Sequence, residues 1–469
     1  MYKRMNNRST LSVAVTAALL LSGCMSLAPK YERPAAPVAA SFPALAPAPE
    51  GAAASSIEWQ RFFPDPRLQQ LISRALVNNR DLRIAIANIE QARAQYQIRR
   101  ADQLPSVGVG VSANRVTNGE DNGIRSQYQA GLTLSTFELD LFGRVRNLSE
   151  AALAQFLATE EARKTTQISL IGSVANAYLA LLADAELLDL TQKTLAAREQ
   201  SLKLVQLKYD NGVVSKLDLQ QALSLVDSAR VVLAQQQRQR AQDINLLTLL
   251  VGEPLPSDPA AGATLAATNL PDLPAGLPSD LLTVRPDIRS VEQQLIAANA
   301  NIGAARAAFF PRITLTGSAG SASSELSGLF KSGSFGWTFA PQAVLPIFDY
   351  GRNSANLGAA RAGRDIAVAQ YERTIQSAFR EVSDALAGQA TFSEQLRSQR
   401  AVAEAEAERF NLSDLRYRNG AASYLDLLDA QRSLFAAQQA AVQANLQRLQ
   451  NQVTLYRVLG GGWTEVAQR

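Results

Sequence analysis

Hydrophobic residues recur along this chain with two different periods, and both periods occur in each half. A helical spacing free of glycine and proline predicts a helix that begins at Asp81 and ends before Pro105. Alternating apolar and polar residues follow on both sides of a polar loop and predict a β-hairpin over residues 105–137. The same order of patterns returns after residue 287, with a second hairpin predicted over residues 311–345.

Each hairpin is followed by a very long stretch without proline. These stretches predict helices over residues 147–209 and 353–417. Leucine recurs every seven residues from Leu188 to Leu202, which is the spacing of a coiled-coil seam and not of a globular helix. A glycine turn then predicts a tip at the end of each long helix, over residues 209–218 and 417–426, and a returning helix over residues 216–251 and 423–459.

The two halves are copies of one unit. The first tip reads KYDNGVVSKLDLQQA from Lys208 and the second reads RYRNGAASYLDLLDAQ from Arg416. Matching landmarks are separated by 206 or 208 residues throughout, which indicates a tandem duplication and argues against two unrelated helical domains. The matched pairs include Pro105 with Pro311, Gly143-Arg144 with Gly351-Arg352, Tyr209 with Tyr417, Gly212 with Gly420, Asp218 with Asp426, and Gly252 with Gly460.

Composition argues against catalysis and against nucleic-acid binding. The chain has no histidine and one cysteine, so the usual metal-binding and nucleophilic sets are missing. It also lacks a glycine-rich phosphate loop followed by Lys-Ser or Lys-Thr. The formal net charge of +4 includes Lys3, Arg4 and Arg8 at the N-terminus, so the remaining chain is close to neutral. The sequence therefore predicts no enzyme, no metal, no cofactor and no nucleic-acid partner.

The N-terminal residues are typical of a bacterial export signal. Basic residues precede an apolar stretch from Leu11 to Leu21 that is too short to remain as a membrane span. Leu21-Ser22-Gly23-Cys24 matches the lipobox of bacterial lipoproteins, which predicts a signal peptide over residues 1–23 and a covalent lipid on Cys24. The alternative is an ordinary signal peptide with an incidental thiol. Residues 24–56, rich in alanine and proline, predict an extended lipidated tether.

Four strands per chain have a consequence for assembly. Strands of about 9–11 residues suit a tilted barrel that crosses an outer membrane. Four strands cannot close a barrel, and an open sheet edge is not tolerated in lipid, so several chains must share one barrel. Eight strands would be filled by their own side chains, whereas twelve or sixteen leave a lumen. These physical arguments require an oligomer but leave its order open.

Several motifs together point to one protein family. They are the lipobox at Cys24, Trp59 with Phe62-Phe63-Pro64-Asp65-Pro66, Asn78-Asn79-Arg80-Asp81-Leu82-Arg83, Leu277-Pro278-Ser279-Asp280-Leu281-Leu282, Arg285-Pro286-Asp287, and both tips. With these motifs the whole mature chain resembles the outer membrane factors of the TolC/OprM type, in particular the lipoprotein branch associated with RND multidrug pumps. The resemblance implies an α+β membrane protein: a homotrimer whose twelve-stranded outer-membrane β-barrel is continued by a long helical coiled-coil barrel.

With this resemblance the chain divides into two repeats and their connections. The resemblance implies an equatorial belt built from residues 57–80, the linker and the C-terminus. We expect a first repeat over residues 57–252, a linker over 253–286, a second repeat over 287–460 and a tail over 461–469.

The function implied by the resemblance is a passive exit duct for drugs and other small molecules. The protein would be lipid-anchored in the outer membrane of a Gram-negative bacterium and extend into the periplasm. A periplasmic adaptor (membrane fusion) protein would dock at the tips around Gly212 and Gly420, and an inner-membrane RND-type pump would supply energy. Two alternatives remain: a duct for type I protein secretion, or a non-conducting structural periplasmic lipoprotein.

The second tip carries a candidate gate. Asp426 and Asp429 are spaced three residues apart on one helix face, so a trimer would place six carboxylates around its axis. Such a ring attracts cations, and crowding raises the proton affinity of its members. The alternative is a helix-capping role.

A latch is implied by the resemblance alone. Asp218 and Tyr417 match positions that join adjacent hairpins by a hydrogen bond in the closed state. The chain departs from the family pattern at Ala422, where a second latch uses arginine, and Lys216 and Arg418 are candidates to replace it.

Overall fold

The computed structural model describes residues 26–42, 54–117, 124–256, 258–274 and 278–463. The predicted signal peptide and Cys24 lie outside these residues. The chain divides into two compact units, which are described separately. The first comprises Met1–Ala36, Ala87–Glu160 and Arg289–Arg373, and the second comprises Pro37–Ile86, Glu161–Ile288 and Thr374–Arg469.

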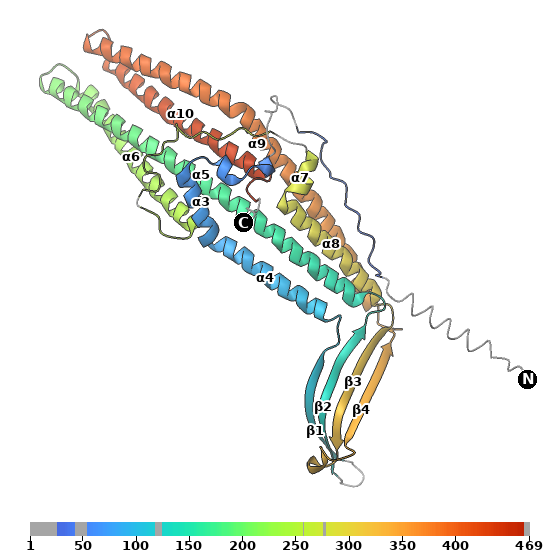
Figure 1. Ribbon diagram of the computed structural model, residues 1–469. Coiled ribbons are helices and arrows are strands. Elements are labelled where there is room, and N and C mark those ends of the chain that lie inside the picture. Colours follow the sequence, from blue (N-terminus) through green and yellow to red (C-terminus); the bar gives the residue numbers. More distant parts are fainter. Residues whose placement is uncertain (1–25, 43–53, 118–123, 257, 275–277, 464–469) are drawn as a thin grey trace, which may run out of the picture. The chain divides into compact units, whose positions relative to one another are not determined.

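Two helices of equal length dominate the chain. Helices α5 (Arg144–Asp210) and α9 (Arg352–Arg418) have 67 residues each, which at about 1.5 Å per residue makes each roughly 100 Å long. In the second unit their C-terminal parts form helical hairpins with α6 (Lys216–Val251) and α10 (Tyr424–Val458) (Figure 1). The other helical elements are η1 (Ala54–Ser56), α2 (Trp59–Phe62), α3 (Pro66–Asn78), α4 (Arg80–Ala101), α7 (Pro278–Val284), α8 (Pro286–Ala307) and η2 (Leu326–Gly328).

The first unit contains one antiparallel sheet in the order β1-β2-β3-β4, visible as a curved ribbon of four strands in Figure 1. Its register gives the sheet an apolar face and a polar face, because side chains alternate along each strand. One row of the apolar face runs through Val109, Leu132, Ala319 and Trp337. The strands are β1 (Val107–Thr117), β2 (Ile124–Leu139), β3 (Arg312–Ser323) and β4 (Phe335–Val344).

A bulge changes the alternation near the end of β2. The register with β3 shifts between Leu134 and Phe137, so residues beyond the shift point to the opposite face from the one that simple alternation would give. Glu138 pairs with Thr314 and therefore lies on the polar face. Without the shift, this carboxylate would lie on the apolar face beside Leu134.

The duplication is visible in the way the returning helices end in the second unit. The Asn79 amide donates to the carbonyl of Leu250 at 2.9 Å, and the Arg285 guanidinium donates to the carbonyl of Val458 at 3.1 Å. Residues 250 and 458 are themselves separated by the repeat offset. In both repeats, the end of a returning helix is thus tied to the start of the short helix that precedes a hairpin, α4 or α8. This supports the predicted internal repeat at the level of individual hydrogen bonds.

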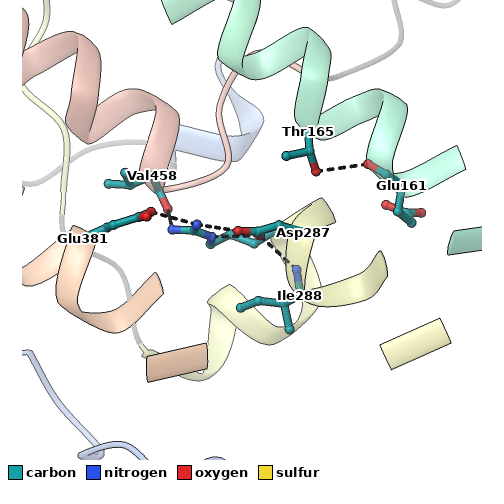
Figure 2. Close-up of polar contacts among 7 residues, drawn as sticks. Glu161, Thr165, Asp287, Ile288, Glu381 and Val458 are labelled. Atoms are coloured by element: carbon teal, nitrogen blue, oxygen red, sulfur yellow. Dashed lines mark hydrogen bonds and ion pairs between the residues drawn. The ribbon is translucent and has the colours of Figure 1, made fainter. Parts of the chain in front are cut away.

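Arg285 explains one of the motifs that carry the family resemblance. Its side chain is 9% exposed and binds Asp287 at 2.6 Å and Glu381 at 2.9 Å. Figure 2 shows Asp287, Glu381 and the carbonyl of Val458 directed toward one guanidinium group, with their contacts as dashed lines. Asp287 also accepts a hydrogen bond from the backbone N–H of Ile288 at the start of α8. The guanidinium thus joins the beginning of α8 to α9 and, through the carbonyl of Val458, to the end of α10. A buried arginine with this many acceptors fixes one arrangement of three helices.

The aromatic segment after the tether packs into the second unit. Trp59, Phe62 and Phe63 are buried, and the Phe62 ring stacks on Tyr456 with 4.0 Å between centroids. The Tyr456 hydroxyl donates to the carbonyl of Ile57 at 2.6 Å. By length and composition α5 contains a stretch apolar enough to span a membrane, but this stretch is mostly buried inside the protein, as in an ordinary core helix.

Residues 26–36 of the predicted tether have no regular secondary structure and are held by contacts within the first unit. The Ser26 hydroxyl donates to the Asn147 side chain at 2.7 Å. Further along, Arg33 forms two hydrogen bonds to the carboxylate of Glu292, at 2.7 and 2.9 Å. The Glu292 side chain is only 9% exposed, so Arg33 supplies the countercharge that its burial requires.

Candidate functional site: the paired helical tips

The turns at the two tips have the same backbone geometry. Gly212 and Gly420 have φ angles of 71° and 70°. In each turn the residue after the glycine donates its N–H to a carbonyl five residues earlier, at 2.8 Å in both tips. A Cβ at either glycine would meet no atom within 4 Å, so glycine is required here for its left-handed backbone and not for space.

The helices that follow begin with identical capping boxes. In the first tip, the Asp218 carboxylate accepts from the backbone N–H and the hydroxyl of Ser215, at 3.0 and 2.8 Å. In the second, Asp426 accepts from Ser423 at 3.1 and 2.8 Å. The hydrogen bonds from Ser423 hold the pKa of Asp426 below its usual range. Within one chain, both aspartates therefore start their helices.

One apolar core lies beneath both tips. The first tip contributes residues of α5 and α6, and the second contributes the opening residues of α10. Partly buried side chains from both hairpins surround this core, including Tyr417. Because the core is shared, a movement of one tip must disturb the packing of the other. Its buried members are Val205, Leu219, Ala222, Leu225, Tyr424, Leu427 and Leu428.

Tyr417 lies beside two residues that sequence reasoning missed. Its hydroxyl accepts a hydrogen bond from the Lys208 ammonium at 3.4 Å, and its ring centroid is 5.5 Å from that of Tyr424. Burial raises the pKa of Tyr424 to about 12, with smaller contributions from Tyr417 and Asp218. Both predicted latch residues thus contribute to the raised pKa of this buried tyrosine.

Among the described residues of one chain, no hydrogen bond joins Asp218 directly to Tyr417. Tyr424 could have been singled out from the sequence as a difference between the repeats, since the corresponding residue of the first tip is Lys216.

Asp429 is not a free carboxylate in a single chain. It forms an ion pair with Arg409 of α9, which also binds Glu406 at 3.1 Å. Asp426 and Asp429 are both exposed, and the contact to Arg409 partly neutralises the second of them. Of the candidates for a second latch, Arg418 is paired with Asp414 on its own helix at 2.8 Å.

Each tip also exposes leucines at matching positions. Leu207 and Leu217 of the first tip correspond to Leu415 and Leu425 of the second, and all four are more than half exposed. Scattered exposed leucines are ordinary, but a set repeated at both tips indicates surfaces that other chains cover.

Comparison with known proteins places the chain in a family. The family model described as "Outer membrane efflux protein" matches residues 71–253 and again residues 277–461, once for each repeat. The chain belongs to the family of outer membrane efflux proteins. Its function is that of an outer-membrane efflux channel, which agrees with the predicted family, fold class and function. Neither the secretion duct nor the structural lipoprotein is favoured.

Relatives and solved structures agree over nearly the whole chain. It is 51% identical to the antibiotic efflux pump outer membrane protein ArpC of Pseudomonas putida, over 98% of this chain and 96% of that protein. It is 46% identical to the outer membrane protein OprJ of Pseudomonas aeruginosa, over 96% of each chain. The crystal structure of the open state of the Neisseria gonorrhoeae MtrE outer membrane channel superposes with a TM-score of 0.86 at 40% identity. That match covers 94% of this chain and 99% of MtrE.

Proposed function

We propose that this chain forms the passive exit duct of a tripartite drug-efflux system, gated at its paired helical tips. The observation that carries the proposal is the twin tip: two hairpins with the same turn, the same capping box and one shared core. Two tips that share a core can move between a closed and an open packing arrangement, and this movement needs no covalent reaction at the tips. Energy is supplied by a partner, and the chain itself catalyses nothing.

The duct is a homotrimer in this proposal. The described residues of one chain provide four strands, and among them β1 and β4 have no neighbour on their outer edges. Three chains joined edge to edge would give twelve strands, enough for a lumen. The apolar face through Val109 and Trp337 would then contact lipid, and the polar face would line the duct.

A lipid on Cys24 fits the docked N-terminal segment. Ser26 is held by Asn147 in the first turn of α5, just beyond the end of β2. In the sequence, Cys24 precedes Ser26 by only two residues. The anchor would therefore enter the membrane beside the base of the sheet.

The gate opens when the equilibrium between the closed and the open arrangement of the tips shifts toward the open one. Six carboxylates from Asp426 and Asp429 would surround the axis of the closed trimer and favour cations. A periplasmic adaptor that docks around Gly212 and Gly420 would bind the dilated form better and so shift the equilibrium toward it. An RND-type inner-membrane pump would deliver the substrate. The name of ArpC supports antibiotics as cargo.

Single-channel recording in planar bilayers tests this gate. The wild-type trimer should show small, cation-selective openings, and Asp426→Asn/Asp429→Asn should enlarge them and reduce selectivity. Asp227→Asn is the matched control, because this exposed carboxylate on α6 pairs with Arg230 outside the tip. Unchanged openings in the double variant would refute the acidic gate, and the absence of a channel in the wild type would refute the duct.

A further inference from the structure

A cavity of about 290 Å³ lies in the first unit, where the sheet meets the starts of α5 and α9. Three arginines line it, one each from α5, β3 and α9: Arg144, Arg312 and Arg352. Phe142 and Phe310 add an aromatic wall, with their rings stacked at 4.7 Å. A cavity that combines guanidinium groups with aromatic rings is suited to a ligand that is both anionic and aromatic.

The register of the sheet places this cluster on the polar face. Glu138 lies there because of the bulge in β2, and Arg312 lies there because it is two residues from Thr314 on the same strand. This is the face that lines the lumen of the proposed duct. The cavity adjoins the ends of β2 and β3, and Val344 at the end of the edge strand β4 also lines it. In the proposed trimer a neighbouring chain would pair with the outer edge of β4, and the polar face would still be directed toward the lumen.

The charges in the cavity do not cancel. Glu138 binds Arg144 at 2.6 Å and Arg312 at 2.6 Å, so one carboxylate serves two guanidinium groups. Arg352 is exposed, and its side chain has no hydrogen-bond or ion-pair partner among the residues that the structure describes.

The other carboxylates near these arginines already have partners. Asp102, which interacts electrostatically with Arg144, is paired with Arg99 at 3.5 Å. Asp140, which also lines the cavity, accepts from the backbone N–H of Arg146 at 2.7 Å in the first turn of α5. Asp349 accepts from the N–H of Asn353 at 2.9 Å in the first turn of α9. The partial positive charge of a helix N-terminus offsets part of the negative charge of each of these two aspartates. The guanidinium of Arg352 is left available to an external anion.

The duplication shows that this excess charge is specific to the second repeat. Arg144 and Arg352 occupy matching positions, separated by 208 residues. Arg144 is neutralised by Glu138, but the residue of the second repeat that matches Glu138 is Pro346. The second repeat thus keeps the arginine without its carboxylate.

We propose that this cavity is a subsite for aromatic organic anions inside the duct. Arg352, supported by Arg312, would bind the carboxylate or sulfonate, and the Phe142–Phe310 pair would contact the ring. Guanidinium groups suit such anions because they donate two parallel hydrogen bonds. The inference rests on the proposed duct, in which a trimer would hold three such subsites around one lumen, with a charge opposite to that of the acidic tip.

Block of single channels by 1-naphthalenesulfonate tests the subsite. The probe, added to each side in turn, should reduce the wild-type current in a concentration-dependent way, and neutral 1-naphthol should not. In Arg352→Gln the half-blocking concentration should rise about fivefold or more, as expected for the loss of one charge-assisted hydrogen bond. The reversal potential in a potassium chloride gradient should also move toward greater cation selectivity, which a purely structural role would not produce.

Arg361→Gln is the matched control. Arg361 is an exposed arginine on α9, about 14 Å along the helix from Arg352, and does not line the cavity. Its block and reversal potential should equal those of the wild type. Equal block by the sulfonate and the alcohol, or equal block in wild type and Arg352→Gln, would overturn the subsite while leaving the duct intact. A wild type without conductance would instead refute the duct.

Discussion

At the scale of single residues, the most unusual titrating group among the described residues is a buried aspartate outside both tips. Asp184 on α5 lies next to Asp243 on α6 within the second unit. Burial, together with the neighbouring carboxylate of Asp243, raises the pKa of Asp184 to about 8, and Arg240 opposes the shift. A protonated Asp184 is uncharged, so it can lie against Asp243 without repulsion between like charges. The contact between α5 and α6 at this point is therefore favourable while Asp184 is protonated.

This pair predicts a pH dependence of stability. An aspartate in the unfolded chain has a pKa of about 3.9, so between about pH 4 and 8 the folded chain retains a proton that the unfolded chain loses. The stabilisation is fully present below the unfolded pKa and is lost as the pH rises through the folded pKa of about 8. Asp184→Asn keeps a hydrogen-bonding group that cannot ionise, so it should remove this loss.

Thermal unfolding of the wild type and Asp184→Asn between pH 5 and pH 9 checks the prediction. The variant should become the more stable protein as the pH approaches 9. The exposed Asp227→Asn provides a control with no buried carboxylate changed, and its curve should parallel the wild type. If the Asp184→Asn curve also runs parallel, the pair does not titrate in this range.

At the scale of elements, the sequence predicted features that depend on neighbouring residues far better than features that depend on residues distant along the chain. The tips could be found because Gly212 and Gly420 need left-handed backbone, and because Ser-x-x-Asp marks a capping box within four residues. The bulge in β2 and the ion pair between Arg409 and Asp429 could not be found, since both depend on residues distant in the sequence. The docking of the N-terminal segment was missed for the same reason.

The left-handed turn at a tip makes a prediction about local stability. Gly420→Ala should destabilise the second tip by about 1–2 kcal/mol, because φ at this position is 70° and a Cβ opposes that conformation. Hydrogen exchange followed by mass spectrometry should show faster exchange around this turn. The rest of α9 should be unaffected.

Gly358→Ala is the companion variant for this measurement. Gly358 lies inside α9, and a Cβ there would meet no atom within 4 Å. Its replacement should slow exchange locally, since alanine favours a helix interior by about 0.5–1 kcal/mol. If both variants accelerate exchange equally, the backbone conformation is not the cause.

At the scale of the whole molecule, one chain is incomplete in two places. Within the part of the chain that the structure describes, the outer edges of β1 and β4 have no pairing partner, and the tips expose matching leucines. Open strand edges cannot persist in lipid, so the sheet cannot function in a membrane without further chains. The same assembly would cover leucines at the tips. The sheet thus requires further chains, and the exposed leucines at the tips are compatible with the same assembly.

The faces of the sheet decide whether that assembly can insert. Phe339 and Ala340 are neighbours on β4, so their side chains point to opposite faces. Phe339 pairs with Gly317 on the apolar face, which would contact lipid, and Ala340 pairs with Thr316 on the polar face.

Phe339→Lys should cost up to about 2–4 kcal/mol in each chain, because a charge at mid-membrane loses its hydration, whereas Ala340→Lys faces water in the lumen. Semi-native electrophoresis of outer membranes should therefore show a heat-modifiable trimer in Ala340→Lys and a depleted one in Phe339→Lys. The reverse ranking would mean that the polar face contacts lipid, and the lumenal placement of Arg352 would fall with it.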